Sequence, residues 1–109
     1  MRPTTGRTVT VAATQMACSW DREANVSGVE RLVREAAARG AQIILPQELF
    51  ETPYFCKDQK QELFALAHPV EDHPVIARMS ALARELSVVI PTSFFERARN
   101  AYYNSLAMI

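Results

Sequence analysis

An apolar run that ends at a proline, Ile43-Ile44-Leu45-Pro46, constrains this chain more than any other feature. A short and wholly apolar run is typical of a strand buried on both faces, as in a parallel sheet covered by helices. The proline has no N–H to donate to a neighbouring strand, so strand pairing is expected to stop there. The run therefore predicts a buried strand whose carboxyl end lies beside the proline.

Glu48 follows closely after this proline and is the residue most in need of an explanation. In open α/β sheets, ligands bind at the carboxyl ends of the strands. A carboxylate held there between Leu49, Phe50 and the core would be partly desolvated, as suits a general base. The alternative interpretation is an ordinary solvated glutamate of a loop.

The residues before this run predict a strand and then a helix. Residues 8–15 begin with alternating Thr and Val and continue with small apolar residues, as in a strand that enters a sheet interior. Asp21, or alternatively Asn25, suits the N-cap of a helix that runs to about Arg39, and Gly40 suits its end. The apolar face of this helix consists of Val26, Val29, Leu32, Val33, Ala36 and Ala37.

Residues 41–45 complete a strand–helix–strand unit. The two strands of such a unit are expected to be parallel, with a right-handed crossover through the helix. Their carboxyl ends then lie at the same edge of the sheet. Gln15 and Glu48 are therefore expected to meet there, which favours a functional site at this edge.

The middle of the chain predicts a short helix, a loop and a longer helix. Residues 57–67 are mostly helix-forming. Pro74 suits the first turn of the next helix, with Asp72 or His73 as its cap and an end near Leu86. The expected apolar face of this second helix consists of Ile76, Met79, Leu82, Ala83 and Leu86.

The last residues predict a hairpin. Residues 88–96 form a strand with Pro91 at an edge or bend, residues 97–100 form a turn, and residues 102–109 form an antiparallel partner strand. The pattern stops in an apolar strand at Ile109, so the whole chain, 1–109, is expected to be an incomplete domain. An unpaired apolar edge of this kind leads us to expect that the isolated chain aggregates or stays loosely packed.

Charge and hydropathy exclude several classes of partner. Twelve basic and twelve acidic residues cancel without any basic cluster, which argues against nucleic acid. No apolar run approaches the roughly 20 residues of a membrane span, and the polar, turn-prone residues 1–7 lack the core of a signal peptide. We therefore expect a cytoplasmic protein without a membrane or nucleic-acid partner, and the two cysteines are expected to be reduced.

Other kinds of chemistry lack support in the sequence. Three glycines cannot build a phosphate-binding loop, and we expect no cofactor. His68 and His73 lie in a proline-bounded turn that fits no common metal motif, so no metal site is expected, and both histidines are interpreted as capping or solvated. Cys56 is interpreted as a small buried hydrophobe and Cys18 as an ordinary thiol, because neither has a local base or cation to activate it.

Tyr54 lies in the same segment as Glu48 and allows two interpretations. Its ring could line the mouth of a pocket beside Glu48 and contact a substrate, or it could cover the core beneath the loop, as Phe55 could.

Several stretches together resemble the nitrilase, or carbon–nitrogen hydrolase, superfamily. They are the first strand, the capped helix, residues 39–50 and residues 100–106. The sequence Pro-Gln-Glu-Leu-Phe-Glu at 46–51, followed by Pro-Tyr-Phe-Cys at 53–56, is most similar to the N-carbamoylputrescine amidase branch. The resemblance implies an α/β fold, the N-terminal part of an α-β-β-α sandwich of the nitrilase type.

The resemblance also implies a mechanism with a Glu–Lys–Cys triad. In that superfamily the glutamate takes a proton from the thiol, the thiolate attacks the carbamoyl or amide carbon, and the lysine stabilises the tetrahedral species. Glu48 matches the glutamate, whereas no residue of this chain matches the lysine or the cysteine. The expected reaction of the complete protein is the hydrolysis of N-carbamoylputrescine to putrescine, CO2 and ammonia.

On this basis the chain alone is predicted to be inactive, with Glu48 as its catalytic residue and Tyr54 as a substrate-binding residue. The expected partner of the complete protein is a small carbamoyl-amine or amide, and we expect it to form a homo-oligomer. The alternatives are an amidase for another carbamoyl-amine or ω-amide, and an inactive fragment or interaction module that keeps the fold.

Overall fold

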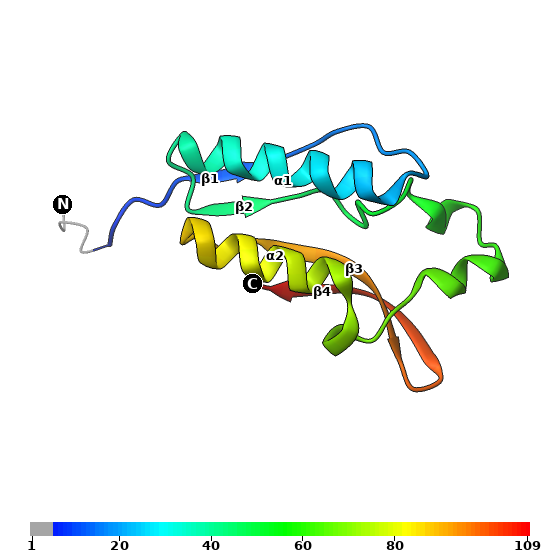
Figure 1. Ribbon diagram of the computed structural model, residues 1–109. Coiled ribbons are helices and arrows are strands. Elements are labelled where there is room, and N and C mark those ends of the chain that lie inside the picture. The colour runs from blue at the N-terminus through cyan, green and yellow to red at the C-terminus, as the bar shows by residue number, and fades with distance from the viewer. Residues whose placement is uncertain (1–5) are drawn as a thin grey trace, which may run out of the picture.

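The computed structural model describes residues 6–109, so most of the predicted polar segment 1–7 lies outside the described residues. The molecule is elongated, with principal extents of 56 × 28 × 25 Å. Two helices, α1 and α2, lie beside four strands, and the far end of the hairpin that β3 and β4 form projects beyond the helices (Figure 1). The bounds of these elements are β1 Val11–Ala13, α1 Arg22–Ala38, β2 Ile43–Leu45, α2 Pro74–Leu86, β3 Pro91–Ala98 and β4 Ala101–Met108.

The predicted strand–helix–strand unit is confirmed. Strands β1 and β2 are parallel, with Val11 opposite Ile43. Asp21 is the N-cap of α1, since its Oδ1 accepts a hydrogen bond of 3.1 Å from the Ala24 N–H. Gly40 follows the end of the helix with a φ of +93°, a left-handed conformation that glycine adopts at little cost. Both strands are shorter than predicted, at 3 residues each.

The hairpin is also confirmed, and it joins the first two strands through Val89. The Ile44 N–H donates to the Val89 carbonyl and the Val89 N–H donates to the Gln42 carbonyl, both at 2.9 Å. Strands β3 and β4 are antiparallel, with Phe95 opposite Asn104. The resulting order across the molecule is β1, β2, β3, β4. Pro91 is the first residue of β3, where its missing N–H does the least harm.

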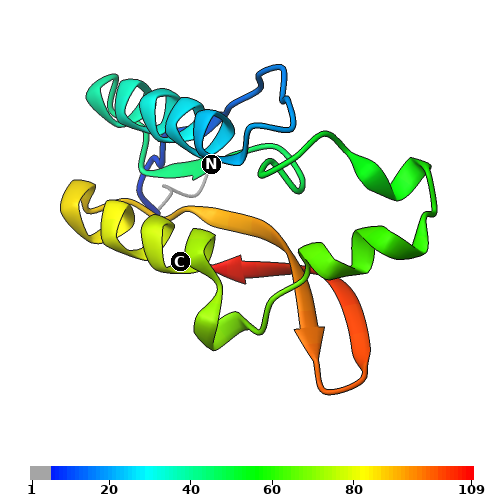
Figure 2. The same cartoon turned by 45° about the vertical axis from the view of Figure 1, so that its right-hand side comes forward.

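Both helices cover the same face of these strands (Figure 2). Ile44 and Ile90, each 0% exposed, pack from the strands into a core shared by the two helices. The helical members of this core are Val26, Val29 and Val33 of α1 and Val75, Met79, Leu82 and Ala83 of α2. Within residues 6–109 no layer covers the other face, and Leu45 is 46% exposed there. The prediction that this strand is buried on both faces is therefore wrong.

The segment between β2 and α2 differs from the prediction of one α-helix over 57–67. It forms 3₁₀ helices at Phe55–Lys57 and Gln61–Leu66, and a further 3₁₀ turn at Val70–Asp72. Gln59, with a φ of 50°, interrupts the helical backbone between the first two. His73 is the N-cap residue of α2 and Pro74 its first residue, but the imidazole makes no capping hydrogen bond. Val75 is buried in place of the predicted Ile76.

Ion pairs join the two helices along their outer side. Arg78 of α2 contacts Glu23 at 2.9 Å and Glu30 at 2.8 Å, both on α1. Arg34 of α1 pairs with Glu30 at 3.0 Å and with Glu85 of α2. These contacts hold the helices in one layer. Neither helix of the described residues is long and apolar enough to cross a membrane.

Candidate active site

A tight turn follows β2 and decides where Glu48 points. Leu49 has a φ of 48°, an uncommon conformation for a residue with a side chain. This turn directs Leu49 and Phe50 into the protein, where they are 3% and 1% exposed, and leaves Glu48 on the surface. The expectation that Glu48 is held between these two side chains and the core is therefore wrong, although its place past the carboxyl end of β2 is as predicted.

Glu48 lies in a groove of about 440 Å³ on the sheet face that the helices leave open. The groove residues are Leu45, Pro46, Gln47, Glu48, Ser93, Asn104, Ser105 and Leu106. Asn104 Nδ2 donates a hydrogen bond to Glu48 Oε1. Ser93 Oγ accepts a bond of 3.1 Å from the Leu49 N–H. The groove thus combines one carboxylate with neutral polar groups and apolar walls.

Ser93 and Asn104 were missed as site residues by the sequence reasoning. Both lie on the hairpin, far along the chain from Glu48, and no local motif marks them. The alternation of side chains along the predicted strands was the one available signal, because it places Asn104 and Leu106 on the same face of β4. That signal does not tell which other element faces them.

The loop after β1 reaches this edge through Gln47 and not through Glu48. Gln47 Oε1 accepts a 2.7 Å hydrogen bond from the Met16 N–H, and its Nε2 donates to Cys18 Sγ at 3.3 Å. Gln15 is exposed. The carboxyl ends of β1 and β2 lie at the same edge as predicted, since the Thr14 N–H donates to the Leu45 carbonyl, but in the described residues no hydrogen bond joins Gln15 to Glu48.

Neither cysteine is placed as a reactive thiol. Cys18 Sγ donates to the Phe50 carbonyl at 3.3 Å, and burial raises the pKa of its thiol, so it stays protonated at neutral pH. Cys56 is half-buried in the first 3₁₀ helix. The interpretation of Cys18 as an ordinary thiol fits these contacts.

Tyr54 and Phe55, which follow the turn, differ in how far they are buried. Phe55 is buried at 6% exposure and its ring centroid lies 5.0 Å from that of Phe95, so Phe55 covers the core. Tyr54 is 46% exposed. The negative charge of Glu48 is the largest cause that raises the pKa of the Tyr54 hydroxyl. Tyr54 therefore lies within the electrostatic reach of Glu48.

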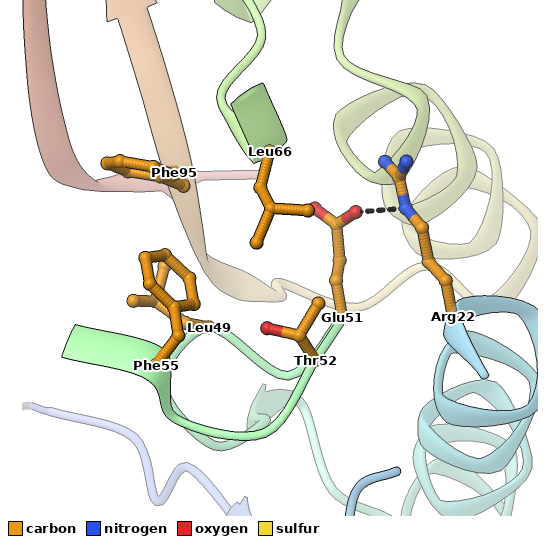
Figure 3. A pocket seen from close by; sticks show the side chains of 7 residues that line it. All are labelled: Arg22, Leu49, Glu51, Thr52, Phe55, Leu66 and Phe95. Carbon is orange, nitrogen blue, oxygen red and sulfur yellow. Dashed lines mark ion pairs between the residues drawn. The ribbon is translucent and has the colours of Figure 1, made fainter. Parts of the chain in front are cut away.

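Arg22 of α1 and Glu51, which follows the turn, form a second group of charged residues (Figure 3). Arg22 Nε pairs with Glu51 Oε2, and Glu51 Oε1 lies 3.3 Å from His73 Nε2. Burial raises the pKa of Glu51, against the opposing effect of Arg22. A cavity of about 30 Å³ adjoins Arg22 and Glu51, which is room for about one water molecule.

His73 belongs to this buried group. It is 1% exposed, and burial lowers its pKa to about 4, so it is neutral at neutral pH. The interpretation of His73 as a capping or solvated histidine is therefore wrong: it occupies the N-cap position, but its ring is part of the interior. Residues 6–109 contain no group of three His, Cys, Asp or Glu side chains that could hold a metal ion.

Asn25 ties this turn to the loop before α1. Its Oδ1 accepts from the Ser19 N–H at 2.9 Å, and its Nδ2 donates to the Ser19 and Glu51 carbonyls at 2.6 and 2.7 Å. Asn25 is 2% exposed, so these bonds are shielded from water. The sequence suggested Asn25 only as an alternative helix cap, whereas its amide joins two loops.

Comparison with known proteins agrees with this architecture. Residues 10–109 match the family model of the carbon–nitrogen hydrolases. The chain is 58% identical over 103 residues to an N-carbamoylputrescine amidase from Arabidopsis thaliana, a match that covers 94% of this chain and 34% of that protein. It is 40% identical over 101 residues to a citrullinase from Francisella tularensis, covering 93% of this chain and 35% of the relative.

The solved structure of another carbon–nitrogen hydrolase has a similar fold. The carbon–nitrogen hydrolase from Helicobacter pylori G27 superposes with a TM-score of 0.81 at 27% identity, over 92% of this chain and 35% of that one. The chain thus spans about a third of the length of the relatives it matches. By its family match and its fold, this chain belongs to the carbon–nitrogen hydrolase family.

Proposed function

We propose that the whole protein containing this chain hydrolyses a non-peptide carbon–nitrogen bond in a small carbamoyl-amine, with Glu48 as the general base. The observation that carries this proposal is the position of Glu48 past the carboxyl end of β2, in an open groove of about 440 Å³. A groove of this size accommodates a small molecule, and the exposed carboxylate is accessible to a reacting group within it.

The names of the relatives support a substrate with a terminal ureido group. N-carbamoylputrescine and citrulline, the compounds after which the two relatives are named, both end in a carbamoyl group bonded to an amine nitrogen. We put N-carbamoylputrescine first because that relative is the more similar one, at 58% against 40% identity. The products would then be putrescine, CO2 and ammonia. Tyr54, which is exposed and whose pKa Glu48 raises, is proposed to contact the substrate at the mouth of the groove.

The proposed mechanism needs groups that this chain does not supply. Glu48 would take the proton of a thiol, the thiolate would attack the carbamoyl carbon, and a lysine would stabilise the tetrahedral species before ammonia leaves. Water would then hydrolyse the resulting thioester, which restores the thiol and releases a carbamate that gives CO2 and putrescine. Cys18 cannot take the thiol's part, because its proton is held by the Phe50 carbonyl and its pKa is raised. We therefore propose that residues 1–109 form an incomplete domain without activity of their own.

The proposal is tested with the isolated chain and with the full-length product of its gene. Release of putrescine and ammonia from N-carbamoylputrescine is measured for both, with citrulline as a second substrate. We expect turnover by the full-length product and none by the isolated chain. Glu48→Gln should lower kcat of the full-length product by about 100-fold to 10,000-fold, because Gln keeps the shape but cannot take a proton.

Glu62→Gln is the matched control, since Glu62 is an exposed glutamate of the second 3₁₀ helix, away from the groove. It should leave kcat unchanged. Turnover by the isolated chain above that of its own Glu48→Gln variant would contradict the proposed inactivity. A full-length Glu48→Gln variant that is as active as Glu62→Gln would remove Glu48 from the mechanism.

A further inference from the structure

We propose that Asn104 and Ser93 are positioning residues for Glu48. Asn104 binds Oε1 of the Glu48 carboxylate, which leaves Oε2 to accept the proton in the reaction. This inference rests on the proposed role of Glu48 as the general base. It assigns a task to two side chains of the hairpin that have no part in the Glu–Lys–Cys scheme.

The three side chains and the turn form a closed path of hydrogen bonds. The Leu49 N–H donates to Ser93 Oγ at 3.1 Å. Ser93 Oγ donates in turn to Asn104 Oδ1 at 3.4 Å, and Asn104 Nδ2 donates to Glu48 Oε1. Because Glu48 and Leu49 are consecutive, the path starts and ends on the same turn. It therefore links the backbone of the turn to the carboxylate that the turn carries.

The register of the hairpin places both positioning residues on the groove face. Ser93 is opposite Leu106, and Phe95 is opposite Asn104. Ser93 and Asn104 are thus diagonal neighbours on one face, a separation that polar side chains bridge. Phe94, the residue after Ser93, points to the other face and is 3% exposed in the core, next to His73. The core contact of Phe94 fixes the direction of Ser93.

The path also fixes which end of the Asn104 amide faces Glu48. The Ser93 hydroxyl has accepted the Leu49 N–H, so its own proton is free to bind the Asn104 carbonyl oxygen. The Glu48 carboxylate only accepts hydrogen bonds, so it takes the amino end of the Asn104 amide and leaves the carbonyl end for the Ser93 hydroxyl proton. A carboxylate with one oxygen held by a neutral donor keeps a single orientation, and Glu48 Oε2 has no hydrogen bond from residues 6–109. Oε2 is therefore the oxygen that we assign to the proton transfer.

Positioning predicts an effect on the chemical step and not on substrate affinity. In the full-length gene product, Asn104→Ala should lower kcat by about 10-fold to 100-fold, since a misplaced catalytic group loses rate in this range. KM for N-carbamoylputrescine should change by less than about 3-fold. Ser93→Ala should have a smaller effect in the same direction. Asn100→Ala is the matched control, because Asn100 is an exposed asparagine in the turn of the same hairpin.

Asn104→Asp separates positioning from mere structural support. Aspartate keeps the shape of Asn104 and its acceptor for Ser93, but sets a second carboxylate against Glu48. Its kcat should lie at or below that of Asn104→Ala at about pH 8, and should recover in part towards about pH 6, where one proton shared by the pair restores a donor. The Asn104→Ala variant should show no such recovery.

Hydrogen exchange of the Leu49 amide tests the same path without reference to activity. Ser93→Ala should speed this exchange by at least about 10-fold, because the N–H loses its acceptor, and Asn100→Ala should not. Two results would overturn the inference and leave the proposed function standing. One is unchanged exchange of the Leu49 amide in Ser93→Ala. The other is unchanged kcat in Asn104→Ala and Asn104→Asp while Glu48→Gln is inactive. An active Glu48→Gln variant would instead overturn the proposed function, and the exchange measurement would still decide on the path.

Discussion

Among single residues, His73 has the most unusual environment. Its ring is 1% exposed, packs edge-on against Phe94 at 5.2 Å between centroids, and lies 3.3 Å from Glu51 Oε1. Burial is the main cause that lowers its pKa to about 4, whereas a histidine in an unfolded chain has a pKa of about 6.5. Between these two values the unfolded chain binds a proton that the folded chain does not.

We therefore predict that the free energy of unfolding falls as the pH is lowered from about 6.5 to about 4, by up to about 3 kcal/mol from His73 alone. His73→Phe keeps an aromatic ring against Phe94 and removes this proton. Urea unfolding of the full-length gene product and the variant, at about pH 7.5 and about pH 5, measures the effect. The variant should gain stability relative to the parent at the lower pH.

Glu51 lies next to His73 and acts in the opposite sense. Its pKa is raised by burial, so the folded chain binds its proton more readily, and its contribution to stability is lost as the pH rises through the folded pKa. Because Glu51 lies 3.3 Å from His73 Nε2, its own titration also changes in His73→Phe, so parent and variant are compared again in a Glu51→Gln background. If the difference in stability between parent and variant is the same at both pH values, His73 is not the titrating group.

The proposed general base could be located from the sequence, whereas its partners could not. Pro46 ends a strand by a local rule, and that rule places Glu48 at the sheet edge. Asn104 is 56 residues away, and its contact with Glu48 depends on the hairpin register and on the φ of 48° at Leu49. No pattern in the sequence indicates that this residue adopts a left-handed conformation.

At the scale of elements, the first half of the chain was predictable because each element carries its own stop signal. Asp21 and Gly40 bound α1 as predicted. The stretch 61–66 lacks such signals and lacks burial, since this 3₁₀ helix has no buried residue. Helix propensity alone did not make it an α-helix, because tertiary packing supplies most helical stability in a folded protein.

The glycine that follows the end of α1, Gly40, allows one of these stop signals to be tested by itself. A Cβ at Gly40 would meet nothing within 4 Å, so Gly40→Ala adds no clash and tests only the φ of +93°. We expect the variant to lose about 1 kcal/mol of unfolding free energy, the usual cost of a side chain in a left-handed conformation. Gly6→Ala is the matched control, because a Cβ there also meets nothing within 4 Å and no left-handed φ is involved.

Urea unfolding of both variants in the full-length gene product measures this difference. The control should stay within about 0.5 kcal/mol of the parent. Equal stability of the two variants would show that the end of α1 does not depend on glycine.

At the scale of the whole molecule, the helices cover one face of the strands and leave the other to solvent. Val11 is 67%, Leu45 46%, Leu106 59% and Met108 71% exposed on the described chain. Large side chains that are exposed together in this way are unusual for a stable monomer. Strand β4 is also the last in the order, and within residues 6–109 no strand pairs with its outer edge. Glu48 and its groove lie on this same face.

We therefore predict that the isolated 109-residue chain self-associates or stays loosely packed, because burial of this face and edge is favourable. Analytical ultracentrifugation and thermal melting measure its state. Replacing Leu106 and Met108 together by Lys should shift the chain towards monomer, since charged side chains on an edge strand oppose pairing. Ser80 and Ala81, exposed on α2, replaced together by Lys add the same charge elsewhere and serve as the control. A parent chain that is monomeric and melts cooperatively would contradict the prediction. If the control pair shifts the chain towards monomer as much as the Leu106 and Met108 replacements do, the shift is due to net charge and not to this face.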